Sequence, residues 1–387
     1  MRFLPRERKQ LSLKSIEMGL ISNKPTAIKG DELQLTFGLT LDEITKKRIA
    51  FFPAEWYPQS GVQLTWPHAN TDWKEMLEEV EECFTQIAAA ITKQEIVVIV
   101  TPDIEQVKQR ISPFVKMKNI RFVACDTNDT WARDHGAITT IEQQQPQLLD
   151  FCFNGWGMKF AANYDNQITR KAISQQRIKG HYHNHLQFIL EGGSIESDGA
   201  GTLLTTKACL LSKNRNETYN QTTIEQTLKS LLHVDRVLWL EHGYLAGDDT
   251  DSHIDTLARF CPNNTILYVS CKDKEEEHYK ELSLMEKELQ QFRTREGAPY
   301  RLMALPMATA IYDGEERLPA TYANFLVINN AVLYPTYQQI ENDLQAKEVL
   351  QQAFPEREII GIDCTALIKQ HGALHCVTMQ YPLHVID

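Results

Sequence analysis

The sequence lacks several features that would place it in other classes of protein. No apolar run approaches the roughly 18 residues that a membrane-spanning helix needs, and no apolar block follows the basic residues at the start. Excess positive charge is also missing: the net charge is −11, whereas phosphate contacts of a nucleic-acid binder need a basic surface. We therefore expect a soluble, unexported protein with no membrane or nucleic-acid partner.

Paired cysteines are absent as well. The eight cysteines are scattered singly, with no CxxC pair and no regular spacing, which favours reduced thiols in a cytoplasm. The one dense histidine stretch, at His181, His183 and His185, has no cysteine nearby and is poorly suited to a structural zinc site. We expect a cytoplasmic protein that holds no metal.

The composition is that of an ordinary globular protein, with 42% hydrophobic and 24% charged residues in a chain of 387. A chain of this length can bury a sizeable core without disulfides or metals. Residues 1–48 are polar and charged with only short apolar stretches, and we interpret them as an N-terminal extension of unassigned role. Residues 49–387 are expected to form a single domain.

A repeated hairpin and helix is the main periodic pattern. The first part has helical spacing over 72–91, apolar strands over 95–100 and 120–124, and a helix over 104–117 broken near Pro113. Strand-turn-strand patterns recur downstream, over 137–153, 194–206, 257–269 and 324–334. Helical patterns come between and after them, over 223–232, 275–292 and 338–353. Such recurrence predicts a repeated structural unit.

A fifth unit would have to combine the two ends of the domain. The segment 55–66, with an expected turn at Gln59-Ser60-Gly61, would pair with strands near the C-terminus. That pairing would close a ring and remove exposed sheet edges. An ordinary open sheet is the alternative, but it would show parallel strands separated by helices rather than repeated hairpins. The pattern favours the closed α/β architecture.

The segment HGALHCVTMQYP, from His371 to Pro382, contains one candidate nucleophile, Cys376. Taken alone, this is a cysteine in a half-apolar strand, and most such cysteines are inert core residues. Chemistry at Cys376 therefore depends on partners elsewhere in the chain.

The segment LAGDDTDSHIDTLARF places His253 and Asp255 two residues apart. In an extended segment these side chains would point to one face, while Ile254 and Thr256 packed on the other. The preceding acids Asp248 and Asp249 fit a solvated loop equally well. We predict that His253 and Asp255 face a common cavity.

Two further segments carry acids in unusual settings. NDTWARDHG offers Asp134 beside Arg133 and Trp131, just before a predicted strand, although a surface turn with an Arg-Asp contact would explain it too. LEGG ends an apolar run with Glu191, followed by two glycines that permit backbone conformations barred to other residues. A strand terminator would explain the glycines but not a carboxylate at the end of a buried run.

Together these segments resemble the agmatine deiminase and peptidyl-arginine deiminase family of the guanidine-modifying superfamily. The resemblance extends over roughly residues 50 to 385 and includes FPAEWYPQSGVQLTWP (52–67), EGGSIESDGAGTLLTT (191–206) and RLPATYANFLVINNAVLYP (317–335). It implies the pentein fold, an α/β propeller of five pseudo-symmetric ββαβ blades around a central site. The repeated hairpins agree with this fold.

The resemblance also implies roles for individual residues. Cys376 would be the nucleophile, His253 the general acid and base, and Glu191 its orienting partner, favouring the imidazolium form. Asp134 and Asp255 would hold a guanidinium, beside Trp131 in the substrate site. A planar, charged guanidinium suits two aligned carboxylates, and protonation by histidine makes its amine a better leaving group. No metal or organic cofactor is required.

Two departures from the family pattern bear on the substrate. The family commonly has glycine before the catalytic histidine, where this chain has Ser252. Before the cysteine this chain has His371-Gly372-Ala373 rather than a run of glycines. Neither departure removes a reacting group, but residues beside the nucleophile shape the pocket.

The implied activity is hydrolysis of agmatine, a small cationic guanidinium compound, to N-carbamoylputrescine and ammonia, as in putrescine biosynthesis. Protein-arginine deimination is the main alternative and would need an open site mouth. Free arginine fits less well because no motif is assigned to its carboxylate, and an amidinotransferase would make no ureido product. A non-catalytic pentein that binds a large partner would be expected to lack the reacting residues. The sequence leaves the oligomeric state open, with a homodimer among the options.

Overall fold

The structure is a computed structural model that describes residues 49–387. The N-terminal extension expected over residues 1–48 lies outside the described residues. The described part belongs to one compact unit of short strands and helices, of the α/β class. Within it, no helix combines the length and the apolar character needed to cross a membrane.

Five of the six described sheets share one pattern: an antiparallel pair of strands is followed by a strand parallel to the second. The strands of the first two sheets, in the order in which they pair, are β1 (Ala50–Phe51), β5 (Ile138–Glu142), β6 (Gln145–Cys152) and β7 (His181–Ile189), then β8 (Ile195–Ser197), β9 (Thr202–Thr206) and β10 (Arg236–Leu240). The next two are β11 (Ala258–Cys261), β12 (Thr265–Ser270) and β13 (Arg301–Pro306), then β16 (Leu326–Ile328), β17 (Ala331–Thr336) and β18 (Glu358–Asp363).

The fifth sheet joins the two ends of the described chain. Its strands are β19 (Thr378–Pro382), β2 (Gln59–Thr65), β3 (Ile96–Thr101) and β4 (Ile120–Ala124). The antiparallel pairing of β19 with β2 confirms that a C-terminal strand completes this unit. A small separate hairpin consists of β14 (Tyr312–Asp313) and β15 (Glu316–Arg317).

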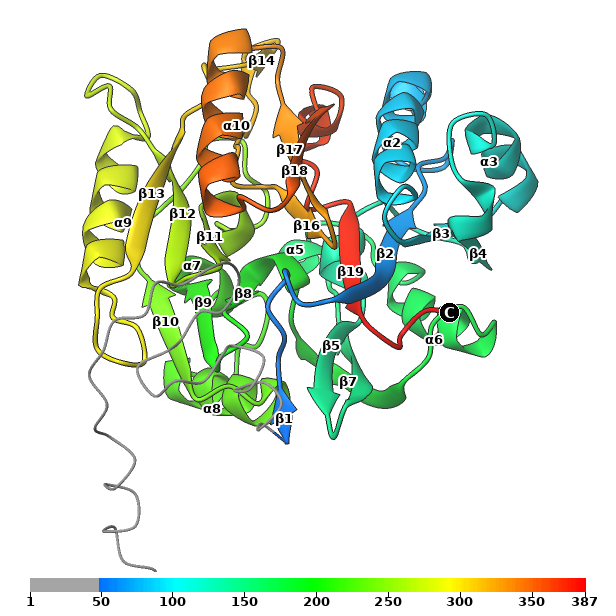
Figure 1. Ribbon diagram of the computed structural model, residues 1–387, viewed down its shortest axis with the longest axis horizontal. Coiled ribbons are helices and arrows are strands. Elements are labelled where there is room, and N and C mark those ends of the chain that lie inside the picture. Colours follow the sequence, from blue (N-terminus) through cyan, green and yellow to red (C-terminus); the bar gives the residue numbers. More distant parts are fainter. Residues whose placement is uncertain (1–48) are drawn as a thin grey trace, which may run out of the picture. The chain divides into compact units, whose positions relative to one another are not determined.

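The longer helices connect the parallel strands of these units and lie at the periphery, outside the strands (Figure 1). They are α2 (Leu77–Ile91), α3 (Ile104–Ile111), α6 (Ile168–Ser174), α8 (Gln221–Leu232), α9 (Tyr279–Gln291) and α10 (Ile340–Ala353). Short helical turns lie near the site or in loops: α4 (Ala132–His135), α5 (Gly155–Met158) and α7 (Lys207–Leu210). The remaining turns are 3-10 helices: η3 (Lys74–Met76), η4 (Met117–Asn119), η5 (Asp165–Gln167), η6 (Gly192–Ser194), η7 (Ile254–Thr256) and η8 (Leu367–Gln370).

Local chemistry explains several of these elements. Strand β3 is a run of apolar, mostly β-branched residues, and it lies between two parallel neighbours with nearly every side chain buried. Helix α3 begins where the side chain of Asp103 accepts a hydrogen bond from Gln106 N, and helix α8 begins with a capping box between Asn220 and Thr223. The helix predicted over 104–117 ends at Ile111, two residues before Pro113.

Two expectations about the ring are wrong. Pairing of the two chain ends does not remove the exposed sheet edges, because the described sheets are all open and keep two edge strands each. The expected turn at Gln59-Ser60-Gly61 is instead the start of β2, because these residues pair with β19 across the sheet. The four predicted hairpins and the three helical patterns that come between and after them are confirmed.

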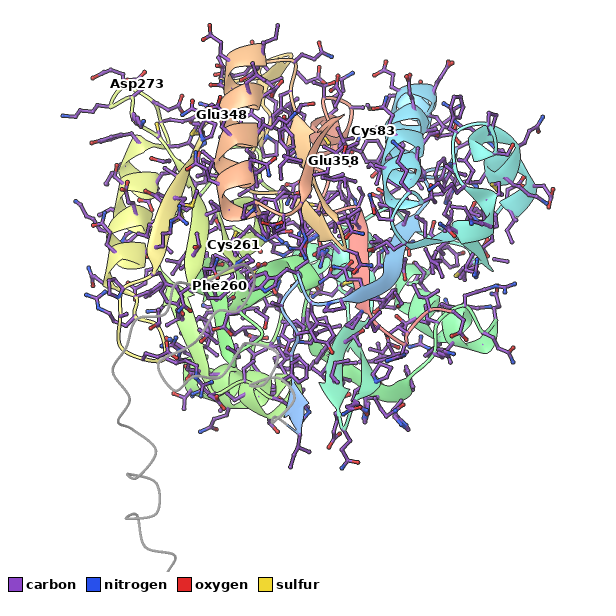
Figure 2. All side chains as sticks on the ribbon, viewed as in Figure 1. Cys83, Phe260, Cys261, Asp273, Glu348 and Glu358 are labelled. Atoms are coloured by element: carbon purple, nitrogen blue, oxygen red, sulfur yellow. The ribbon has the colours of Figure 1, made fainter. Side chains whose placement is uncertain are left out.

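Apolar side chains fill the space between the strands and the surrounding helices. Phe260 and Cys261 on β11 are buried there, whereas Glu348 on α10 and Asp273 in a loop lie at the outer surface (Figure 2). A tightly packed interior of this kind holds the ends of neighbouring strands in fixed positions. The candidate site is built from such strand ends and the turns that follow them.

Candidate active site

A pocket with about 510 Å³ of empty space brings together three of the predicted site residues, Trp131, Asp134 and Cys376. Its other lining residues are Asp72, Asp129, Trp156, Phe160, Asp248, Asp249, Thr250, Thr256, Gln370, His371 and Gly372. His253 and Asp255 are almost completely buried beside it, at 1% and 0% exposure. The pocket is therefore aromatic and acidic, a combination suited to an organic cation.

Cys376 lies between η8 and β19, where the chain turns back into the sheet. Its carbonyl accepts a hydrogen bond from Arg133 N at 3.0 Å, which joins it to the segment that carries Asp134. Its thiol lies 3.4 Å from Asn324 Oδ1. Burial raises the pKa of Cys376 well above its ordinary value, and the negative charges of Asp255 and Asp134 raise it further. The free protein therefore holds Cys376 as a thiol.

Asp134, Asp255 and His253 converge beside Gly193. A Cβ atom placed on Gly193 would lie 2.6 Å from His253 Nδ1, 2.9 Å from Asp134 Oδ1 and 3.1 Å from Asp255 Oδ2. Any side chain at this position would collide with the three polar atoms, so glycine is needed here for close approach. The LEGG motif thus brings its backbone against the acidic pair.

The two carboxylates differ in their surroundings. Asp134 accepts hydrogen bonds from Gly193 N at 3.0 Å and from Trp156 Nε1 at 2.9 Å. Burial, followed by the charges of Asp255 and Glu191, nevertheless raises the pKa of Asp134 well above its ordinary value. Burial would also raise the pKa of Asp255, but hydrogen bonding and charge from His375 lower it overall. The pair can therefore take up the charge of a bound cation.

His253 differs from the sequence expectation in two ways. It does not lie in an extended strand with Asp255, because η7 begins at the next residue; Ile254 is in the core, but Thr256 lines the pocket instead of packing away from it. Burial lowers the pKa of His253 to about 3, against the opposing charge of Asp255. The expectation of an imidazolium is therefore wrong for the free protein, and the neutral ring is available as a base.

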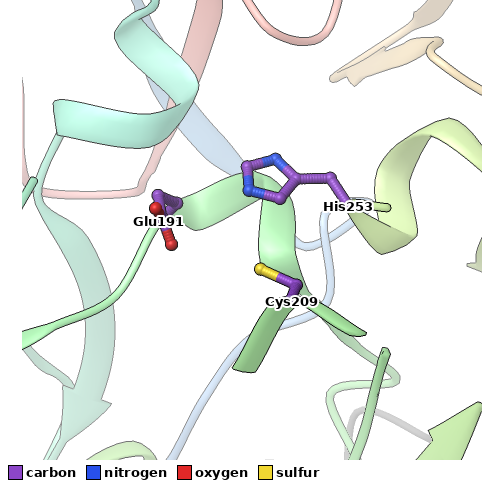
Figure 3. Close-up of side chains that lie close together, drawn as sticks. All are labelled: Glu191, Cys209 and His253. Carbon is purple, nitrogen blue, oxygen red and sulfur yellow. The ribbon is translucent and has the colours of Figure 1, made fainter. Parts of the chain in front are cut away.

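Glu191 approaches His253 but is bound to another residue. Its two carboxylate oxygens accept hydrogen bonds from Arg215 Nε at 2.8 and 3.0 Å, and both side chains are completely buried. The atoms of Glu191, Cys209 and His253 that could ligate a metal ion lie within 4.8 Å of one another, and the ring of His253 is directed towards the other two side chains (Figure 3). Because Arg215 already neutralises Glu191 and burial raises the pKa of Cys209 well above its ordinary value, this cluster is unsuited to a cation.

Aromatic rings form one side of the pocket. The ring of Trp131 lies 5.7 Å from that of Trp73 and 6.0 Å from that of Trp156, and its Nε1 donates to Asp129. A Cβ on Gly372 would lie only 2.0 Å from the Trp131 ring, so the loop before Cys376 can pass here only with glycine. These contacts fix the Trp131 ring in the pocket that Cys376 also lines.

Sequence reasoning missed several residues that support the site. Asn324 Oδ1 accepts from both His375 N and Cys376 N, at 2.8 and 3.3 Å, and Arg215 holds Glu191. His375 bonds Asp255 Oδ2 through Nδ1 at 2.7 Å. The only available signal was their presence in or near the quoted segments, because each contact joins residues far apart in the chain.

Comparison with known proteins identifies the family of the chain. The family model for Porphyromonas-type peptidyl-arginine deiminase matches residues 51–382. The chain belongs to this family. The putative agmatine deiminase of a Marinomonas species is 32% identical over 350 residues, which cover 85% of this chain and 94% of that protein. The agmatine deiminase of Pseudomonas aeruginosa (strain UCBPP-PA14) is 30% identical over 356 residues, covering 85% and 95%.

Solved structures of the deiminase family are similar over most of the chain. A putative arginine deiminase from Porphyromonas gingivalis has 53% identity and a TM-score of 0.83, covering 87% of this chain and 100% of that one. A cysteine-to-serine variant of the C. jejuni agmatine deiminase, with substrate bound, has 38% identity and a TM-score of 0.80, covering 87% and 97%. The α/β fold is therefore shared with these enzymes.

The two departures from the family pattern occur at unusual backbone positions. Ser252 has φ of 65° and His371 has φ of 64°, in the left-handed region that favours glycine. The backbone of Ser252 donates to Asp248 Oδ2 and accepts from Thr206 Oγ1, and His371 Nδ1 lies 2.8 Å from Gly247 O. In this deiminase, both loops that border the pocket thus carry a non-glycine residue in a strained backbone conformation.

Proposed function

We propose that the protein hydrolyses the guanidinium group of agmatine to N-carbamoylputrescine and ammonia. The observation that carries the proposal is the meeting of Cys376 and Asp134 in one acidic pocket, with Asp255 and the neutral base His253 buried next to Asp134. Paired carboxylates match the two edges of a guanidinium, and a buried thiol beside them can reach its central carbon. The relatives named above as agmatine deiminases support the same reaction.

The pocket also suits the rest of agmatine. The rings of Trp131 and Trp156 can cover its methylene chain, and Asp248 and Asp249 add acidic side chains to the lining. Agmatine carries a second positive charge on its terminal amine, which these acids would attract. Free arginine carries a carboxylate near the same end, which they would repel.

The first half of the reaction forms a covalent intermediate. The bound cation lowers the pKa of Cys376, and His253 accepts the thiol proton. The thiolate forms an S–C bond with the guanidinium carbon, giving a neutral tetrahedral adduct. His253 then returns the proton to one amino group, the C–N bond breaks, and ammonia leaves a positively charged amidino-thioether on Cys376.

Hydrolysis releases the product. Water enters where ammonia left, and His253 takes a proton from it as it attacks the amidino carbon. The C–S bond breaks, the hydroxyl proton of the adduct passes to Cys376, and the neutral ureido group departs. The proton held by His253 is released to solvent, where it converts the ammonia to ammonium. Glu191 and Arg215 are placed behind His253 and would keep its ring oriented during both proton transfers.

Turnover of purified protein tests the proposal. Agmatine, an Nα-acylated arginyl peptide and free arginine are compared, and both ammonia and ureido product are measured. We expect equimolar products from agmatine, abolished in Cys376→Ala and retained in Cys271→Ala, which removes another buried thiol. Product from the peptide but not from agmatine would instead support peptidyl-arginine deimination, the activity in the family's description. If neither the wild-type protein nor Cys376→Ala turns over any of the three substrates, the result would support a binding role.

Three broader features belong to the same proposal. We infer that residues 49–387 form a single catalytic domain whose five sheet units are arranged as blades around a pseudo-fivefold axis. All eight cysteines lie in the described part of the chain and are unpaired there, which favours a reducing cytoplasm. The product would then supply putrescine biosynthesis in that compartment.

A further inference from the structure

A histidine next to the nucleophile is held between two carboxylates. His375 is 1% exposed; its Nδ1 lies 2.7 Å from Asp255 Oδ2 and its Nε2 lies 2.7 Å from Glu55 Oε2. A neutral imidazole has one N–H and cannot donate to two carboxylates at once. A further proton shared among these three side chains would satisfy both contacts and make both hydrogen bonds charge-assisted. Burial and the charges of Arg133 and Arg259 lower the pKa of His375, and Arg259 Nη2 lies 3.2 Å from His375 Nε2, so Asp255 and Glu55 must offset these effects.

The outer carboxylate is firmly anchored. Glu55 Oε1 accepts from Val327 N at 2.6 Å, and Glu55 Oε2 accepts from Arg259 Nη2 at 2.7 Å. Arg259 is itself completely buried and donates to Glu196 at 2.9 Å and to Phe325 O at 2.6 Å. Although burial acts in the opposite direction, Arg259 and His375 hold the pKa of Glu55 far below its usual range. Glu55 is therefore a fixed negative charge behind His375.

The inner carboxylate is left with one free oxygen. Asp255 Oδ2 is occupied by His375, whereas Asp255 Oδ1 has no hydrogen-bond partner among the described residues although Asp255 is completely buried. An unpartnered, buried carboxylate oxygen beside Asp134 is costly unless a ligand satisfies it. A guanidinium N–H is a suitable partner.

We propose that His375 is a positioning residue for deimination: it holds Asp255 charged and oriented, so that Oδ1 points at the guanidinium. Asp255 would not stay charged without such support, because Asp134, Asp248 and the buried Cys376 also face it. The remaining positive or protonatable groups that act on it are His253, Arg133 and Arg259. This role rests on the proposed deiminase function.

The pH dependence of kcat/KM for agmatine tests the role in the full-length protein. In His375→Leu, which removes both hydrogen bonds, we expect the acid limb to move to higher pH by about one unit or more. KM should rise more than kcat falls, because the change weakens a substrate contact. His375→Asn keeps a donor near Asp255 and should give an intermediate shift. A merely structural histidine would lower the amount of folded enzyme without moving the acid limb.

A second pair of variants tests the contact between His375 and Glu55. Glu55→Gln removes the negative charge behind His375 and should shift the acid limb in the same direction by a smaller amount. Glu81→Gln is the matched control, because Glu81 is also buried and bonded to an arginine and a tryptophan, but lies on α2 outside the site. It should leave the profile unchanged.

The outcomes separate the two proposals. A wild-type acid limb in both His375→Asn and Glu55→Gln overturns the role of His375, even if His375→Leu fails to fold. A shift of equal size in Glu81→Gln also overturns it, because the effect would then follow from any buried glutamate. Absence of ureido product from the wild-type protein instead refutes the deiminase function on which this role rests.

Discussion

Replacing Asp134 with asparagine separates the catalytic use of this carboxylate from its effect on stability. The change keeps the shape of the side chain but removes one of the two charges that would hold the guanidinium. Loss of one member of a buried charge pair costs about 3 to 5 kcal/mol, or roughly 10²- to 10⁴-fold in kcat/KM. We expect Asp134→Asn to lose agmatine turnover by this factor, measured as ammonia release coupled to NADPH oxidation.

The stability of the same variant should change little. Burial and the charges of Asp255 and Glu191 raise the pKa of Asp134, so at pH 8 its carboxylate form destabilises the native state and asparagine relieves that effect. Against this, Trp156 Nε1 or Gly193 N loses its acceptor, because an amide offers only one oxygen, at about 1 to 3 kcal/mol. We expect melting temperatures within about 3 °C of wild type.

A matched control and a clear contrary result are available. Asp150 is also buried and its pKa is also raised by burial, but it bonds Tyr182 and Arg170 away from the pocket. Asp150→Asn should keep kcat/KM near the wild-type value. A folded Asp134→Asn enzyme that keeps kcat/KM within about tenfold of wild type would refute the paired-carboxylate site.

Three further predictions concern other parts of the site and the fold. Ser252→Gly removes backbone strain at φ of 65° and keeps both backbone hydrogen bonds. It should therefore stabilise the protein by about 1 kcal/mol or less in urea unfolding, with unchanged activity. A destabilised variant would show that the backbone at Ser252 is not strained. Because the free Cys376 is a thiol and the pocket is acidic, a cationic haloacetamidine should inactivate the enzyme faster than a neutral haloacetamide at pH 7; equal rates would argue against substrate-assisted ionisation. Burial raises the pKa of Glu95 to about 7, so the native state binds this proton more tightly than the unfolded state does. The native state therefore loses stability as the pH rises from about 4.5 to 7. Glu95→Gln should reduce the stability loss between pH 5 and 8 by about 2 kcal/mol, and an unchanged loss would contradict the raised pKa of Glu95.

Much of the local structure could be predicted from the sequence because it depends on neighbours in the chain. The alternating and helical apolar patterns predicted β3, β4, α2, α9 and α10 to within a few residues. The segment 59–61 was predicted wrongly as a turn, although it forms the start of β2. Its serine and glycine favour a turn locally, but pairing with a strand more than 300 residues away decides its conformation.

The candidate site was only partly predictable. Motifs placed Cys376, Asp134 and Asp255 in one site, but the support of Asp255 by His375 and Glu55 was not foreseen. Glu55 and His375 are separated by 320 residues, and neither lies in a pattern that marks a buried ion pair. Such pairs form because the strand ends meet in three dimensions, which a single sequence does not reveal.

By itself, the sequence determined the recurring hairpins and the helices between and after them, and it supplied a thiol, a histidine and paired acids in family-like segments. Only the tertiary structure decided their chemical states: a thiol rather than a thiolate at Cys376, a neutral ring at His253, and two unlike carboxylates at Asp134 and Asp255. The reason is physical. Protonation depends on burial and on the charges within a few ångströms, and here those charges come from distant parts of the chain.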